Sequence, residues 1–301
     1  MRAIRRAGTA RNVSAPRHPK SGWRCIAAYC ARISHVHDAA MTFTTLRYEK
    51  SERIALVTFS TPDNLNAITE TRLDELEAVL SDCENDEDIG ALIMTGEGRA
   101  FCVGLDLDLL DQAFGDLDYF DVIVARINGI ITRLENLEFP TITANNGFTR
   151  AGGFEISLGC DFMIVADEAK VGDVHTDAGV VPAAVTLRLR RRVGDMRAKE
   201  ILWTAKWYKG QEAVDIGLAI KSVPLANLVK EARNFAKSMI DKPRPTLAAL
   251  KNILRDGEGL SVAEGAALEL KTFAHYNRTQ PFGSEGYRAF REGRKPSWKS
   301  A

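Results

Sequence analysis

Residues 141–166 read TITANNGFTRAGGFEISLGCDFMIVA, and this stretch sets the expected fold. Thr141–Ala144 is a short apolar segment after a proline and is predicted to be a strand. Gly152-Gly153 opens a short helix that runs through Leu158, and Phe162–Ala166 is the next predicted strand. A strand, a helix and a strand in succession favour parallel pairing in an α/β protein.

The same alternation extends on both sides of this stretch. Further strands are predicted at Arg53–Ser60 and Gly90–Thr95, which are rich in β-branched and aliphatic residues. Apolar residues at helical spacing predict helices over Ile68–Leu80 and Tyr119–Leu137. From Ala183 onward the chain is predicted to be mainly helical, with 218–223 as one short extended piece. The pattern indicates an α/β core followed by a helix-rich region.

Composition excludes several classes of protein. The chain has 301 residues, 45% of them hydrophobic, and no run approaches the 18 apolar residues that a membrane-spanning helix needs. Five scattered cysteines do not suggest a disulfide framework and fit a reducing compartment. The formal charge is zero overall, but residues 1–40 hold eight of the 40 basic residues and one of the 40 acidic ones. The remainder is therefore mildly acidic, which disfavours nucleic acid as a partner.

Residues 1–40 are set apart by their arginines and the scarcity of acids. This composition is typical of an organellar transit peptide, but we favour an extension that is not native to the protein, because Met41 is followed directly by the first strand-like segment. We therefore expect three parts: an N-terminal extension over 1–40, a core over 41–240 and a helical region over 241–301. The expected location is the cytoplasm, or the mitochondrial matrix if residues 1–40 are a transit peptide. The Cys and His spacing in this extension matches no zinc pattern, so no metal site is predicted.

Two glycine-containing loops are candidates for binding a carbonyl oxygen. Gly98–Leu107 (GRAFCVGLDL) follows a predicted strand directly, and Gly104 allows a sharp turn that leaves the Leu105 N–H pointing outward. In Asn146–Glu155 (NGFTRAGGFE), the glycines enter a helix whose first N–H groups, including that of Gly152, lack intrahelical partners. Each loop alone also fits an ordinary turn. If both face one pocket, two N–H groups can stabilise an oxyanion or enolate.

Two side chains are candidates for moving a proton near such an oxyanion. Glu155 lies in the first turn of the helix that follows Gly152-Gly153, where a carboxylate is also favourable for purely structural reasons. His175 belongs to Gly172–Asp177 (GDVHTD), where alternation would place Asp173, His175 and Asp177 on one face of an extended segment. This segment can be an acid/base histidine with a carboxylate orienter, a metal cluster or a polar loop.

Four motifs in order resemble the enoyl-CoA hydratase/isomerase (crotonase) family over residues 45–297. They are Thr61-Pro62-x-x-Leu65-Asn66-Ala67, Gly98-x-Ala100-Phe101-Cys102-x-Gly104-x-Asp106-Leu107, Asn146-Gly147-x-x-x-x-Gly152-Gly153-x-Glu155, and Cys160-Asp161. The segment from Glu285-Gly286 to Arg294-Lys295-Pro296 is similar to the last helix of that family.

The resemblance implies an α/β fold, a crotonase-like spiral of ββα units with a C-terminal helical trimerisation region. It implies a homotrimer or a dimer of trimers that binds an acyl-CoA substrate, with no cofactor besides the coenzyme A that the substrate carries. The Leu105 and Gly152 N–H groups would form the oxyanion hole, and Glu155 would be catalytic. The residues implied to contact the substrate are Ala67, Val103, Asp106, Leu107, Phe290 and Lys295.

Departures from the family pattern concern the chemistry. The position of the second catalytic glutamate of the hydratases is His175 here, so activation of water by two carboxylates is in question. Asp63 stands where a basic residue often contacts the CoA phosphates. Arg150 replaces an apolar residue beside the oxyanion loop. Together these departures suggest a divergent member of the family with an unusual acyl group.

The leading hypothesis is an enoyl-CoA hydratase-like lyase of fatty acid metabolism that works through an enolate, with Glu155 assisted by His175. The alternative is a hydrolase of the same family, cleaving a thioester or a C–C bond, or an isomerase, that depends on His175. A third hypothesis is an acyl-CoA-binding scaffold without activity, against which the retention of Glu155 and both loops argues.

Overall fold

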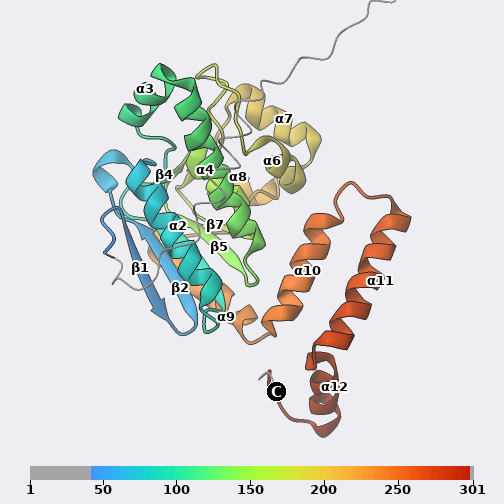
Figure 1. Ribbon diagram of the computed structural model, residues 1–301. Coiled ribbons are helices and arrows are strands. Elements are labelled where there is room, and N and C mark those ends of the chain that lie inside the picture. Colours follow the sequence, from blue (N-terminus) through green and yellow to red (C-terminus); the bar gives the residue numbers. More distant parts are fainter. Residues whose placement is uncertain (1–41, 299–301) are drawn as a thin grey trace, which may run out of the picture. The chain divides into compact units, whose positions relative to one another are not determined.

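The computed structural model describes residues 42–298, so the predictions for residues 1–40 lie outside the described residues. Helices and strands alternate through the first two thirds of this part of the chain, and helices fill the rest (Figure 1). The strands are β1 (Leu46–Ser51), β2 (Ile54–Phe59), β3 (Ala91–Gly96), β4 (Ala100–Cys102), β5 (Thr141–Asn145), β6 (Phe148–Thr149), β7 (Phe162–Ala166), β8 (Lys170–Val171), β9 (Tyr208–Lys209) and β10 (Lys221–Val223). The helices are η1 (Pro62–Asn64), α2 (Glu70–Asn85), α3 (Leu107–Gly115), α4 (Leu117–Asn136), α5 (Ala151–Gly159), α6 (Thr186–Val193), α7 (Asp195–Thr204), α8 (Gly210–Asp215), η2 (Leu225–Asn227), α9 (Leu228–Ile240), α10 (Arg244–Asp256), α11 (Val262–Thr279) and α12 (Phe282–Glu292).

The strands form two sheets. The larger has the order β1-β2-β3-β5-β7-β10 and is parallel except for the antiparallel pair β1–β2. The smaller has the order β4-β6-β8-β9, with β8–β9 as its antiparallel pair. The fold is therefore α/β with predominantly parallel pairing, as the sequence predicts.

Side chains of the large sheet alternate between two apolar cores. Val57 and Met94 face one core, which α2 and α4 cover, whereas Leu56 and Ile93 face the other. Helix α9 covers that second face and packs on β3, β5 and β7. Both faces are thus buried, which explains why β2, β3 and β7 are mainly apolar and lack a regular alternation with polar residues.

The predicted strands and helices of the core are confirmed, with boundaries that differ by a few residues. The short strands of the second sheet were not predicted, because segments of two or three residues carry no measurable periodicity. The extended conformation expected through Asp177 is wrong. The chain turns at His175–Gly179, where the His175 carbonyl accepts hydrogen bonds from the N–H groups of Ala178 and Val180, so Asp177 does not share a face with Asp173 and His175.

Helix α10 is tied to the core, and α11 packs beside α10 (Figure 1). The Lys251 ammonium on α10 donates to a carboxylate oxygen of Asp161 at 2.8 Å and to the Leu134 carbonyl at 3.2 Å. Helix α11 has no buried residue, so most of its surface is open in the single chain.

Two buried asparagines join three loops at one backbone carbonyl. The oxygen of Ala100 accepts from Asn66 Nδ2 at 2.8 Å and from Asn146 Nδ2 at 3.1 Å. Asn146 also receives the Gly96 N–H and donates to the Gly98 carbonyl, both at 3.0 Å. These asparagines therefore hold the β3–β4 turn against the loops that lead to the two predicted N–H donors.

We expect Asn146→Ala to destabilise the protein by about 2 kcal/mol, because buried carbonyl and N–H groups lose their partners. Urea unfolding at a constant protein concentration would measure the change. Asn85→Ala is the matched control, since Asn85 is an exposed helix residue that donates only to the Ser81 carbonyl. Equal losses of stability in the two variants would contradict this role of Asn146.

Candidate active site

A cavity of about 710 Å³ lies where η1, α3, α4, α5 and the loop before α6 meet. Four residues predicted from the motifs to be catalytic line it: Leu105, Gly152, Glu155 and His175. They come from three separate segments of the chain, so the fold brings together groups that the sequence could only associate through a family resemblance.

The two loops that carry the predicted N–H donors pack closely because a glycine, Gly104, stands at their contact. A Cβ on Gly104 would lie 2.7 Å from Ala151 Cβ and 3.2 Å from the Gly152 nitrogen, and Gly104 has a φ of +98°. Only glycine meets both demands. Within residues 42–298 neither the Leu105 N–H nor the Gly152 N–H donates to another protein group, so both are available to a ligand.

The first turn of α5 is pressed against β4. A Cβ on Gly153 would lie 2.2 Å from the Cys102 carbonyl oxygen, and one on Gly152 would lie 2.8 Å from Ile68 Cδ1. No side chain caps this end of the helix. The positive end of the helix dipole therefore faces the cavity, which favours negative charge on a bound oxygen.

Glu155 is buried in the wall of this cavity, with 5% of its surface exposed. Its Oε1 accepts a hydrogen bond of 3.0 Å from the Ala184 N–H. Burial raises the pKa of Glu155, and the charge of His175 and the Ala184 hydrogen bond offset this only in part. The protonated form of this carboxyl group is therefore easier to reach than that of an exposed glutamate, as a group that both accepts and gives a proton requires.

His175 is oriented by Asp173. The His175 Nδ1 lies 2.6 Å from Asp173 Oδ1, and the His175 backbone N–H donates to Asp173 Oδ2 at 3.2 Å. Burial lowers the pKa of His175, but the hydrogen bond and charge of Asp173, together with the charge of Glu155, outweigh it and raise the pKa. With Nδ1 held by the carboxylate, Nε2 is the nitrogen left to act in the cavity.

The residues predicted to contact the substrate fall into two groups. Ala67, Val103, Asp106 and Leu107 line the cavity. The Asp106 carboxylate also caps α3 by accepting the Asp108 N–H at 3.0 Å.

The other two predicted contacts, Phe290 and Lys295, are absent from the lining of this cavity in the described chain. Phe290 on α12 is 85% exposed. Their contact with the substrate therefore stays a prediction.

The sequence analysis missed the apolar wall of the cavity. Five side chains of α3 and α4 form it: Leu110, Phe114, Phe120, Val124 and Ile127. The signal was present as the apolar stripe over Tyr119–Leu137, which predicts a buried helix face but not which part of that face borders a cavity. This wall can receive a hydrocarbon chain.

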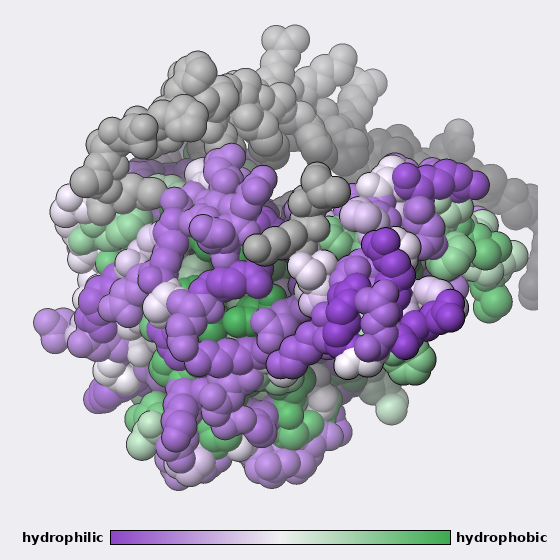
Figure 2. Space-filling model, turned by 90° about the horizontal axis from the view of Figure 1, so that it is seen from below, coloured by the Kyte–Doolittle hydropathy of each residue, from purple (hydrophilic) through white to green (hydrophobic). Residues whose placement is uncertain are grey.

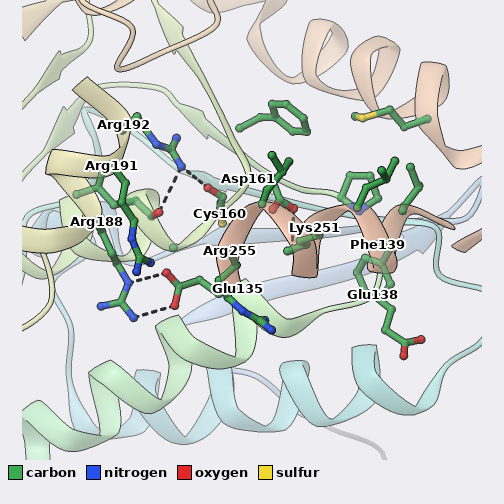
Figure 3. Close-up of a pocket in the computed structure, with 18 residues that line it drawn as sticks. Glu135, Glu138, Phe139, Cys160, Asp161, Arg188, Arg191, Arg192, Lys251 and Arg255 are labelled. Atoms are coloured by element: carbon green, nitrogen blue, oxygen red, sulfur yellow. Dashed lines mark hydrogen bonds and ion pairs between the residues drawn. The ribbon is translucent and has the colours of Figure 1, made fainter. Parts of the chain in front are cut away.

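A second cavity, of about 430 Å³, lies between α10 and the core (Figure 3). Its charged side chains already have partners. Arg188 pairs with Glu135, Lys251 with Asp161, and Arg192 donates to the carbonyls of Leu158 and Cys160. These contacts hold α6 and α10 in place, and none of the predicted catalytic residues lies here.

Among residues 42–298 there is no group of three His, Cys, Asp or Glu side chains placed to hold a metal ion. No helix in the same part of the chain is long and apolar enough to cross a membrane.

Comparison with known proteins gives consistent relatives. The family model described as enoyl-CoA hydratase/isomerase matches residues 49–301. The "Short-chain-enoyl-CoA hydratase" of Clostridium acetobutylicum is 31% identical, over 85% of this chain and 97% of that protein. The "Probable enoyl-CoA hydratase echA8" of Mycobacterium tuberculosis is 30% identical, over 86% and 99%.

Solved structures agree with the sequence comparison. An enoyl-CoA hydratase from Bacillus anthracis superposes with a TM-score of 0.79 at 28% identity, covering 86% of this chain and all of that one. The family model spans most of the described chain, and the two-sheet fold and the cavity carry the motifs of that family in place. The chain therefore belongs to the enoyl-CoA hydratase/isomerase family.

Proposed function

We propose that this chain, an enoyl-CoA hydratase-like enzyme, adds water across the Cα=Cβ bond of an enoyl-CoA thioester with Glu155 and His175 as its acid/base pair. One observation carries the proposal: Glu155 and the Asp173-held His175 line the same cavity as two unpaired N–H groups. The hydratase names of the relatives support the reaction.

The two N–H groups act on the thioester. With the carbonyl oxygen between Leu105 N–H and Gly152 N–H, electron density is drawn from the conjugated double bond, and Cβ becomes electrophilic. Addition at Cβ creates an enolate whose negative oxygen these donors and the positive end of α5 stabilise. One such donor can lower the activation free energy by about 3 kcal/mol.

Glu155 and His175 move the protons. The pair, holding one proton, takes a proton from water as the oxygen attacks Cβ and returns a proton to Cα. One side chain begins the cycle as base and the other as acid, so the pair keeps the same total number of protons. Asp173 holds the imidazole with Nδ1 away from the cavity throughout.

We expect Glu155→Gln and His175→Gln each to lower kcat by about a hundredfold to ten-thousandfold, because each removes one proton carrier. Loss of the absorbance of the conjugated thioester, with product mass as confirmation, would measure hydration of crotonyl-CoA. Glu168→Gln is the control, since Glu168 is exposed and lies outside the cavity.

A different product would select the alternative chemistry. Release of free coenzyme A, or cleavage of a C–C bond, that requires His175 but not Glu155 would place the enzyme among the hydrolases of the family. Migration of the double bond without addition of water would make it an isomerase.

The activity should show a bell-shaped pH profile, because the singly protonated pair is the working form. Both pKa values are raised, Glu155 by burial and His175 by Asp173 despite burial. The acid limb should therefore lie above the ordinary glutamate value of about 4.3 and the alkaline limb above about 6.5. Asp173→Asn should move the alkaline limb of kcat/KM to lower pH. An unchanged alkaline limb in that variant would contradict the role of Asp173.

We also propose that the chain assembles as a homotrimer or a dimer of trimers through its C-terminal helices. Apolar side chains remain exposed there, among them Leu270 and Phe273 on α11 and Phe290 on α12. Figure 2 shows apolar patches at the surface on the side of these helices. Monomeric proteins rarely leave large apolar patches open to water.

The mass of the assembly in solution tests this proposal. Leu270→Glu should shift it toward the single-chain mass of 33.2 kDa, measured by light scattering, because a carboxylate cannot be buried unpaired in an apolar interface. Lys230→Glu on α9, which adds a carboxylate at an exposed position elsewhere, is the control. A monomeric parent protein would refute the assembly.

The location of the enzyme also stays a proposal: the cytoplasm, or the mitochondrial matrix if residues 1–40 are a transit peptide. The relatives from Dictyostelium discoideum and Pongo abelii, each 30% identical, carry the word mitochondrial in their names.

A further inference from the structure

Arg150 is the one arginine or lysine in the lining of the candidate active site among the described residues. It stands directly before α5, and its backbone carbonyl accepts the N–H groups of Gly153 and Phe154. Two residues of chain span at most about 7 Å, so Arg150 begins close to the Gly152 N–H that would grip the thioester oxygen.

The Arg150 guanidinium has no acceptor. Within residues 42–298 it forms no ion pair or hydrogen bond, and its Nε is buried without a partner. It is nevertheless held in place, since it lies 4.2 Å from the centre of the Trp207 ring. Phe148 in turn packs edge-on against Trp207, with the ring centres 5.9 Å apart.

The nearby acids do not use the N–H groups of Arg150. Both Asp173 oxygens bond to His175, through Nδ1 and the backbone N–H. Asp177 lies on the exposed turn. The charges of these two carboxylates act on the guanidinium, but neither forms an ion pair with it.

Two other shielded arginines differ from Arg150 because their terminal nitrogens have acceptors, although the Nε of Arg72 is also without a partner. Arg72, which is fully buried, donates to the carbonyls of Ala67 and Thr45 and to the Thr61 hydroxyl. Arg188 forms a two-bond pair with Glu135. Arg150 therefore stands out as a cation held rigidly, with its N–H groups free, in the wall of a substrate cavity.

We propose that Arg150 binds a carboxylate carried by the acyl chain, so that the preferred substrate is the CoA thioester of an unsaturated dicarboxylic acid. The proposal rests on the proposed function, because it takes the thioester carbonyl to lie between Leu105 and Gly152. From there the acyl chain is within reach of Arg150, whereas the whole pantetheine arm separates the thioester from the CoA phosphates. A planar guanidinium with free N–H groups matches a carboxylate in geometry and charge.

The same contact would reject plain hydrocarbon chains. An acyl group without a carboxylate would shield the guanidinium from water and supply no acceptor, which is costly for a charged group. A site built around a polar contact discriminates strongly against an analogue that lacks it. An acyl carboxylate would also be costly to bury here without Arg150, since Glu155 already lines the cavity.

Two thioesters of equal chain length test the proposal. Glutaconyl-CoA ends in a carboxylate and pentenoyl-CoA ends in a methyl group. The parent protein should prefer glutaconyl-CoA by at least about tenfold in kcat/KM. Arg150→Met should lose about a hundredfold on glutaconyl-CoA and gain on pentenoyl-CoA, because the methyl end then no longer covers an unpaired charge. Arg150→Lys should recover part of the loss. Arg190→Met is the matched control, because Arg190 is an exposed residue of α6 that lies outside the cavity.

Binding separates this proposal from the proposed reaction. In the Glu155→Gln variant, calorimetry should show tighter binding of glutaconyl-CoA than of pentenoyl-CoA, and Arg150→Met should abolish the difference. That result would support the role of Arg150 even if no hydration were seen. Equal preference for the two thioesters in the parent protein, or an equal loss on both in a folded Arg150→Met protein, would overturn it.

Discussion

The carbonyl oxygen of Ala100 is the point on which the catalytic arrangement depends. Asn66 and Asn146, which come from loops 80 residues apart in the chain, both donate to it. The shared acceptor aligns the β3–β4 turn with the loops that lead toward α2 and α5. Because the Leu105 and Gly152 N–H groups follow these segments in the chain, a displacement at Ala100 would separate the two N–H groups that the proposed mechanism places at one oxygen.

The candidate active site combines close contacts between backbone segments with the burial of two ionisable side chains. Gly104 and Gly153 let the chain approach where a Cβ would collide with neighbouring atoms. The same close packing buries Glu155 and thereby raises its pKa, whereas the pKa of His175 is raised by Asp173 and Glu155 against the opposing effect of burial. An aspartate–histidine pair occupies the place where the family resemblance implies a second carboxylate. In the proposed mechanism its histidine serves as the second proton carrier in the cavity that Glu155 also lines.

The charged side chains that line the two cavities differ in how they are paired. The arginines and the lysine between α10 and the core have carboxylate or carbonyl partners, so that cavity serves cohesion between helices. In the candidate active site, two N–H groups and one guanidinium have no protein partner among the residues that the structure describes. Unpaired donors in a folded protein are costly unless a ligand completes them. Their positions match the ligand that we propose, with an oxygen at the thioester and a carboxylate farther along the acyl chain.

The sequence by itself determined the strands and helices of the core, whose apolar periodicity matches the observed elements, and the motif order located both N–H donors and Glu155. Only the tertiary structure decided that His175 pairs with Asp173 and not with Asp177, because a turn at 175–179 replaces the extended conformation. It also decided the short strands of the second sheet, the apolar wall from α3 and α4, and the isolation of Arg150. These features depend on which groups meet across long stretches of chain and on which are shielded from water, and a local pattern of residue types records neither.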